Sequence, residues 1–100
     1  PWQHPDSNSA YHLYVICLDS SKVSLSREQV LKRLRDNGIG AHVHYIPVHT
    51  HPYYQKLGFK HGDFPLAEKY YKNAISLPIF YGLTAEDQNW VIENLSSALS

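Results

Sequence analysis

Three short strand-like segments constrain the fold of this 100-residue chain more than any other feature. Residues 10–18 (AYHLYVICL) are rich in aromatic and β-branched side chains, which predicts a strand buried on both faces in its second half. Residues 39–45 and 74–77 predict two further strands. The few helices between such strands cannot hide both faces of a sheet. The pattern therefore predicts an α+β domain: a small, mainly antiparallel sheet with helices packed on one face.

Helix boundary signals flank these strands. Ser26 followed three residues later by Gln29 has the spacing of a capping box, and Gly38 suits the left-handed position after a helix end. Thr84 and Asp87 repeat the capping pattern, and an apolar stripe follows them. The sequence therefore predicts one helix that ends before Gly38 and a last helix that begins after Thr84.

Two more helical segments are predicted between the second and third strands. Residues 53–57 fit one or two helical turns, and residues 65–73 open with proline in the first turn. Residues 1–9, with two prolines and several polar side chains, predict a linker, and residues 10–100 predict one domain. Because the chain begins Pro-Trp-Gln-His-Pro without methionine, we expect it to be cut from a longer protein.

The charge balance and the cysteine count exclude several classes of protein. Nine Lys plus Arg balance nine Asp plus Glu, so no excess of cations is available for phosphates. We therefore expect neither a nucleic-acid partner nor attachment to a membrane surface, and the apolar runs fall far short of the ~18 residues of a membrane span. The single cysteine, Cys17, cannot form an internal disulfide and fits the reducing cytoplasm.

A loop dense in histidine and tyrosine carries the candidate binding residues. It reads HVHYIPVHTHPYY over residues 42–54. His42 and His44 share a face if the segment is extended and could chelate zinc, but the segment holds no cysteine or carboxylate, so we predict no metal site. Hydrogen bonding of a neutral histidine to a ligand hydroxyl or phosphate is the favoured use. Tyrosine rings suit sugars and nucleobases, and the alternative is that all these side chains serve packing.

No complete catalytic set is visible in the sequence. A nucleophile elbow, a Walker A loop and a dinucleotide-binding glycine motif are all missing. None of the six lysines lies in an apolar stretch suited to Schiff-base chemistry. Cys17 lies in an apolar strand, where a thiol is usually inert. We therefore predict no catalytic residue within this chain.

Two sequence blocks carry a resemblance to a known family. HYIPVH over residues 44–49 and ISLP over residues 75–78, in this order, resemble the C-terminal domain of the DegT/DnrJ/EryC1/StrS family of pyridoxal-phosphate-dependent sugar aminotransferases. The similarity runs from about Ser9 to Leu95. Within the family the chain is most similar to transaminases of pseudaminic acid biosynthesis. Those enzymes make UDP-4-amino-4,6-dideoxy-N-acetyl-β-L-altrosamine from a 4-keto sugar nucleotide.

The resemblance implies a fold-type-I enzyme whose large domain, absent from this chain, holds pyridoxal 5'-phosphate and the Schiff-base lysine. It implies amino transfer from glutamate to C4 of a UDP-linked 4-keto-6-deoxy sugar by a homodimer, with this chain inactive alone. His44, Tyr45 and His49 match the family's H-Y-x-P-x-H block near the cleft, and with Tyr53 they are expected to contact substrate. The alternative is a non-catalytic module that binds a sugar nucleotide or a protein through the same loop.

Overall fold

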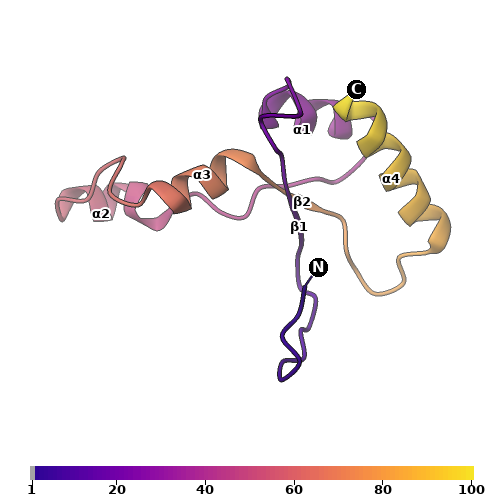
Figure 1. Cartoon of the computed structure of the whole chain (residues 1–100), viewed down its shortest axis with the longest axis horizontal. Coiled ribbons are helices and arrows are strands. Elements are labelled where there is room, and N and C mark those ends of the chain that lie inside the picture. The colour runs from indigo at the N-terminus through magenta and orange to yellow at the C-terminus, as the bar shows by residue number, and fades with distance from the viewer. Residues whose placement is uncertain (1) are drawn as a thin grey trace.

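The computed structural model describes residues 2–100, and its centre is a two-stranded sheet (Figure 1). Strands β1 (Tyr14–Cys17) and β2 (Ala74–Leu77) pair antiparallel, with Tyr14 opposite Leu77 and Cys17 opposite Ala74. Between them lie helix α1 (Arg27–Asp36), the 3-10 helix η1 (Val48–Thr50), and helices α2 (Pro52–Lys56) and α3 (Pro65–Asn73). Helix α4 (Ala85–Leu99) follows β2. The predicted α+β class with an antiparallel sheet is confirmed.

The prediction of a strand at residues 39–45 is wrong. His42 alone pairs with Ser76, in one antiparallel bridge in which His42 N–H donates to the Ser76 carbonyl (3.0 Å) and Ser76 N–H to the His42 carbonyl (2.8 Å). The same register places His44 opposite Ala74, the first residue of β2, and helix α3 ends at Asn73. The next hydrogen-bonded pair would join His44 to Ala74, but the Ala74 N–H donates to the Tyr70 carbonyl at the end of α3 instead. In the other direction Gly40 lies opposite Pro78, which has no N–H to donate. β2 has only four residues, so only part of predicted strand 10–18 pairs with it.

Both predicted capping boxes are formed. Ser26 Oγ accepts from the Gln29 N–H at 3.3 Å, and Gln29 Oε1 accepts from the Ser26 N–H at 2.8 Å. Thr84 Oγ1 accepts from the Asp87 N–H at 3.1 Å, and the Asp87 carboxylate accepts from the Thr84 N–H at 3.1 Å. Each box satisfies backbone donors that a helix start leaves unpaired, so α1 and α4 begin where the sequence predicts.

Gly38 ends α1 in the predicted left-handed conformation, with φ +76°. The Gly38 N–H donates to the Arg35 carbonyl and the Ile39 N–H to the Leu34 carbonyl, each at 2.9 Å. This pair of hydrogen bonds is a Schellman motif, which turns the chain sharply at a helix end. It sends residues 39–42 back across the sheet to the edge of β2.

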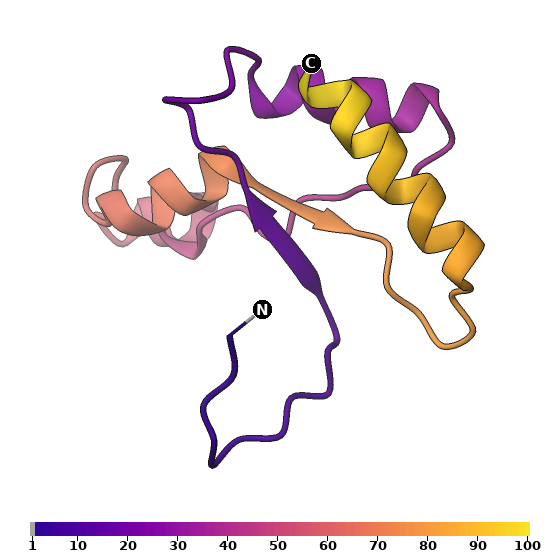
Figure 2. The ribbon, with the colours of Figure 1, turned by 45° about the vertical axis from the view of Figure 1, so that its right-hand side comes forward.

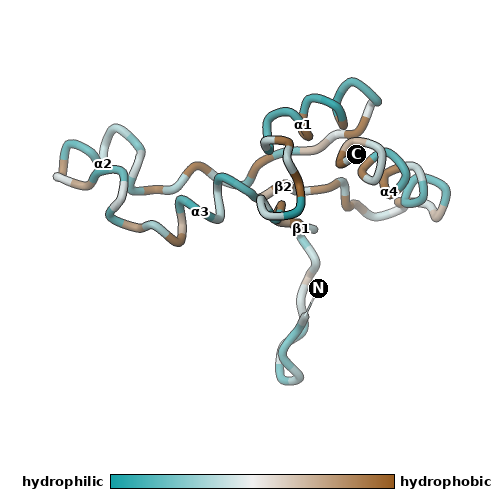
Figure 3. Tube along the Cα trace, turned by 45° about the horizontal axis from the view of Figure 1, so that its top comes forward, coloured by the Kyte–Doolittle hydropathy of each residue, from teal (hydrophilic) through white to brown (hydrophobic). Residues whose placement is uncertain are grey.

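The apolar core lies between one face of the sheet and the helices α1 and α4 (Figure 2). Val30 and Leu34 of α1 and Ile75 of β2 are fully buried there. In Figure 3 brown, hydrophobic stretches lie on β2 and α4, whereas the N-terminal segment is largely teal. The opposite face of the sheet carries neither helix. Cys17 is exposed on that face, and Tyr14 at the other end of β1 is exposed too, so the prediction of a strand buried on both faces in its second half is wrong for both end residues of β1.

Residues 47–73, with η1, α2 and α3, extend away from this core as an arm (Figure 1). The radius of gyration is 15.8 Å, larger than the ~13 Å typical of a compact chain of this length. The extents of 48 × 37 × 24 Å reflect the same elongation. The predicted loop residues 42–54 therefore run from the sheet edge along the arm to α2 (Figure 1). Across residues 2–100, no helix is both long enough and apolar enough to cross a membrane.

Candidate functional site

His44 and Tyr45 lie at the junction between the sheet and the arm. The His44 Nδ1 lies 2.8 Å from the Ser76 hydroxyl oxygen. The two rings meet edge to face with centroids 4.6 Å apart, and the peptide bond between the residues is cis. Tyr45 is 68% exposed, whereas His44 is half-buried. The pair therefore presents an open aromatic surface beside an imidazole that is anchored to the sheet.

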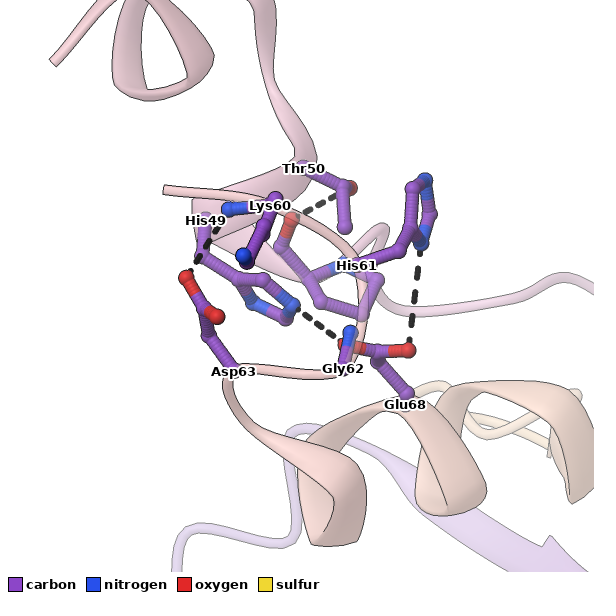
Figure 4. A network of polar contacts seen from close by, with 8 residues as sticks. His49, Thr50, Lys60, His61, Gly62, Asp63 and Glu68 are labelled. Atoms are coloured by element: carbon purple, nitrogen blue, oxygen red, sulfur yellow. Dashed lines mark hydrogen bonds and ion pairs between the residues drawn. The ribbon is translucent and has the colours of Figure 1, made fainter. Parts of the chain in front are cut away.

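His49 is buried in the arm and bound to Glu68 of α3 (Figure 4). Its Nε2 lies 2.7 Å from the Glu68 Oε1, which also accepts from the Gly62 N–H at 2.7 Å. His61 Nδ1 lies 3.8 Å from the other carboxylate oxygen. Gly62 has φ +96°, a left-handed conformation that glycine adopts readily and that turns the loop before α3.

These contacts favour the ionised form of Glu68. The Gly62 N–H bond lowers the pKa of the Glu68 carboxyl most, followed by the His49 hydrogen bond and then by the charges of His49 and His61. An ionised carboxylate accepts stronger hydrogen bonds than a neutral acid does. Glu68 therefore joins η1, the loop before α3, and α3 itself into one unit.

An aromatic cluster supports the same unit. The His49 ring lies 4.9 Å from the Phe64 ring, and Phe59 lies 6.1 Å from Phe64 and 6.3 Å from Tyr54. The ring of Tyr53 stands at 90° to that of Tyr54, with centroids 5.3 Å apart. Tyr53 itself is 67% exposed at the start of α2. The cluster thus fixes the shape of the arm and leaves the Tyr53 ring open to solvent.

The four predicted substrate contacts therefore fall into separate local settings. Hydrogen bonds and ring contacts of residues 2–100 pair His44 with Tyr45 and tie His49 to the Glu68 network. They connect Tyr53 to its neighbour Tyr54. Tyr45 and Tyr53 expose most of their surface, whereas His49 is only 7% exposed. Any ligand that meets all four would span the junction and the arm.

The sequence analysis did not identify two residues that complete these settings. Ser76 belongs to a segment predicted only as a strand, yet its hydroxyl binds His44 from 32 residues away. Glu68 follows His49 by 19 residues and belongs to a different helix. Neither spacing is a recognisable motif, because only the return of the chain through α3 and β2 brings these residues together. The position of Ser76 within the ISLP block is the one sequence signal that pointed toward it.

The described residues do not form a complete cofactor or metal site. A cofactor held as a Schiff base needs a lysine in an apolar or cationic setting, and all six lysines here are exposed. Between residues 2 and 100, no three His, Cys, Asp or Glu side chains are placed to share a metal ion. The chemistry that this surface supports is recognition through hydrogen bonds and aromatic contacts.

Known proteins match nearly the whole chain. The model of the DegT/DnrJ/EryC1/StrS aminotransferase family matches residues 1–96. The spore coat polysaccharide biosynthesis protein SpsC of Bacillus subtilis is 45% identical over 95 residues, which cover 93% of this chain and 24% of that protein. This chain spans about a quarter of the length of such curated relatives.

Solved structures show the same likeness in three dimensions. Helicobacter pylori PseC, an aminotransferase involved in the biosynthesis of pseudoaminic acid, is 30% identical with a TM-score of 0.80, covering 91% of this chain and 24% of PseC. The putative sugar aminotransferase Spr1654 of Streptococcus pneumoniae, in its PMP-form, is 29% identical with a TM-score of 0.78. That match covers 87% of this chain and 22% of Spr1654, which is also known in a PLP-form.

Proposed function

The chain belongs to the DegT/DnrJ/EryC1/StrS aminotransferase family, and from this premise we propose that it is the C-terminal domain of a pyridoxal-phosphate-dependent sugar aminotransferase. The complete enzyme transfers an amino group from glutamate to C4 of a UDP-linked 4-keto-6-deoxy sugar of the pseudaminic acid type. The family match over residues 1–96 is the observation that carries this proposal. The likeness to PseC supports the choice of sugar.

The contribution of this chain is substrate recognition. His44 offers an imidazole nitrogen to a hydroxyl or phosphate oxygen, since its other nitrogen is held by Ser76. Tyr45 and Tyr53 expose flat rings on which a sugar or a base packs. His49 is held by Glu68, so it shapes the loop that presents the other three residues. Together these four residues form the proposed substrate-binding set.

In this proposal the cofactor is held mainly by residues outside this chain, as the family resemblance implies, and the exposure of all six lysines supports it. Pyridoxal phosphate supplies the chemistry that carries the amino group, and the protein supplies binding and orientation. We propose that the complete enzyme acts as a cytoplasmic homodimer, as the family resemblance implies.

The test uses the full-length gene product that contains this chain. Its visible absorbance is recorded with pyridoxal phosphate, before and after glutamate is added, and the UDP-linked 4-keto sugar follows. We expect a bound-cofactor band that glutamate changes and the keto sugar restores, with the aminated sugar detected by mass spectrometry. A well-folded protein that binds the nucleotide sugar but no cofactor would reject the enzyme and favour a non-catalytic binding module.

Tyr45→Ala tests the part played by this chain. Loss of an aromatic packing surface for a base or sugar costs about 1–3 kcal/mol, so kcat/KM for the keto sugar should fall about 5- to 150-fold. The step with glutamate alone should keep its rate. Tyr81→Ala is the matched control, because Tyr81 is fully exposed in the turn before α4. Equal losses in both variants would remove Tyr45 from the substrate site.

A further inference from the structure

Ser76 lies in β2, at the strand edge that faces His42, and both of its backbone hydrogen-bonding groups have a partner. Its N–H and carbonyl both bond to His42, at 2.8 and 3.0 Å. The residue is only 4% exposed, so its hydroxyl is shielded from solvent. A buried hydroxyl that leaves its proton without an acceptor costs about 1–3 kcal/mol. The single hydrogen bond of this side chain therefore determines where its proton lies.

The acceptor of that proton is the imidazole of His44. Within residues 2–100, the only hydrogen-bond partner of the Ser76 hydroxyl is the His44 Nδ1, at 2.8 Å. If Nδ1 carried the imidazole proton, the Ser76 oxygen would accept and its own proton would be left without a partner. The satisfied arrangement has the Ser76 O–H donating to an unprotonated Nδ1. A neutral His44 then carries its proton on Nε2.

We propose that Ser76 is a positioning residue that sets the tautomer and the ring orientation of His44. The Nε2–H of His44 is thereby presented as a hydrogen-bond donor to an oxygen of the bound nucleotide sugar. The ring of Tyr45, 4.6 Å from that of His44 and inclined at 73°, limits rotation of the imidazole from a second side. This inference rests on the proposed function for the identity of the ligand. The tautomer itself is a property of the free protein.

The first measurement needs no substrate. The full-length protein is labelled with nitrogen-15 in histidine, and long-range proton–nitrogen spectra assign the protonated nitrogen of each ring. His44→Gln identifies the His44 signals by their disappearance. We expect an unprotonated Nδ1 and a protonated Nε2 for His44 near neutral pH. A protonated Nδ1 would overturn the inference, whatever the enzyme assay shows.

Variants of Ser76 separate positioning from simple packing. In Ser76→Ala the His44 signals should show both tautomers in exchange, and Ser76→Thr, which keeps the hydroxyl, should restore the wild-type pattern. Ser97→Ala, a serine exposed on α4, is the control and should leave His44 unchanged. Unchanged His44 signals in Ser76→Ala would also overturn the inference.

The kinetic readout links the tautomer to the ligand. Ser76→Ala should lower kcat/KM for the keto sugar about tenfold, mainly through KM, by analogy with metal sites, where the outer partners that orient a histidine contribute about 10- to 100-fold. Ser76→Thr should recover most of the loss, and the step with glutamate should be unaffected. If the protein lacks aminotransferase activity while the spectra show the expected tautomer, the proposed function fails and the positioning of His44 by Ser76 stands.

Discussion

Truncation of Leu34 tests whether the packing of α1 on the sheet holds this fold together. Leu34 lies in α1 and is completely buried. Leu34→Ala removes three buried carbons, which at about 0.8 kcal/mol each amount to ~2.4 kcal/mol of lost transfer free energy. The cavity left behind adds about 24 cal/mol per Å³, which brings the expected loss of unfolding free energy to about 3 kcal/mol. The melting temperature should fall by roughly 12–24 °C.

The assay is urea denaturation of the 100-residue chain, followed by circular dichroism. The unfolding free energies of wild type and variant are compared with the same dependence on urea concentration (the m value) for both. Leu66→Ala is the matched control, because it makes the same truncation at a position that is 82% exposed on α3. The control should change the unfolding free energy by no more than about 0.5 kcal/mol. A loss below about 1 kcal/mol in Leu34→Ala, or equal losses in both variants, would refute a core organised around α1, β2 and α4.

Two further predictions concern the backbone and the arm. Gly38→Ala should cost about 1–2 kcal/mol, because alanine is strained at φ +76° although no atom lies within 4 Å of its added carbon. Gly40→Ala, with equal space and no positive φ, should be near neutral in the same denaturation assay, and equal costs would contradict the role of backbone strain. The lowered pKa of Glu68 stabilises the fold above its ordinary value of 4.5, and this contribution is lost as the pH falls through the lowered pKa. Melting temperatures between pH 7 and about pH 3 should therefore fall more steeply in wild type than in Glu68→Gln, and parallel curves would show that the Glu68 network does not stabilise the arm.

Local signals in the sequence predicted the helices well. The capping boxes at Ser26 and Thr84 and the glycine at residue 38 act over three or four residues, so a linear pattern contains all the atoms involved. The strand predicted at residues 39–45 failed for the opposite reason. Strand formation needs free backbone partners, and only His42 finds one, because the Ala74 N–H is bonded to Tyr70 of α3 and Pro78 has no N–H.

The candidate site shows the same difference between features set by local sequence and features set by distant contacts. The sequence by itself determined the family resemblance, the loop rich in histidine and tyrosine, and the choice of His44, Tyr45, His49 and Tyr53 as candidate substrate contacts. The hydrogen-bond partners of the two histidines were decided by the tertiary structure alone. Ser76 reaches His44 across the sheet edge, and Glu68 reaches His49 across the arm, over separations of 32 and 19 residues. Side chains that far apart meet only after the backbone has folded, so the hydrogen bonds that hold these two imidazoles, and the lowered pKa of Glu68, depend on contacts that no local pattern contains.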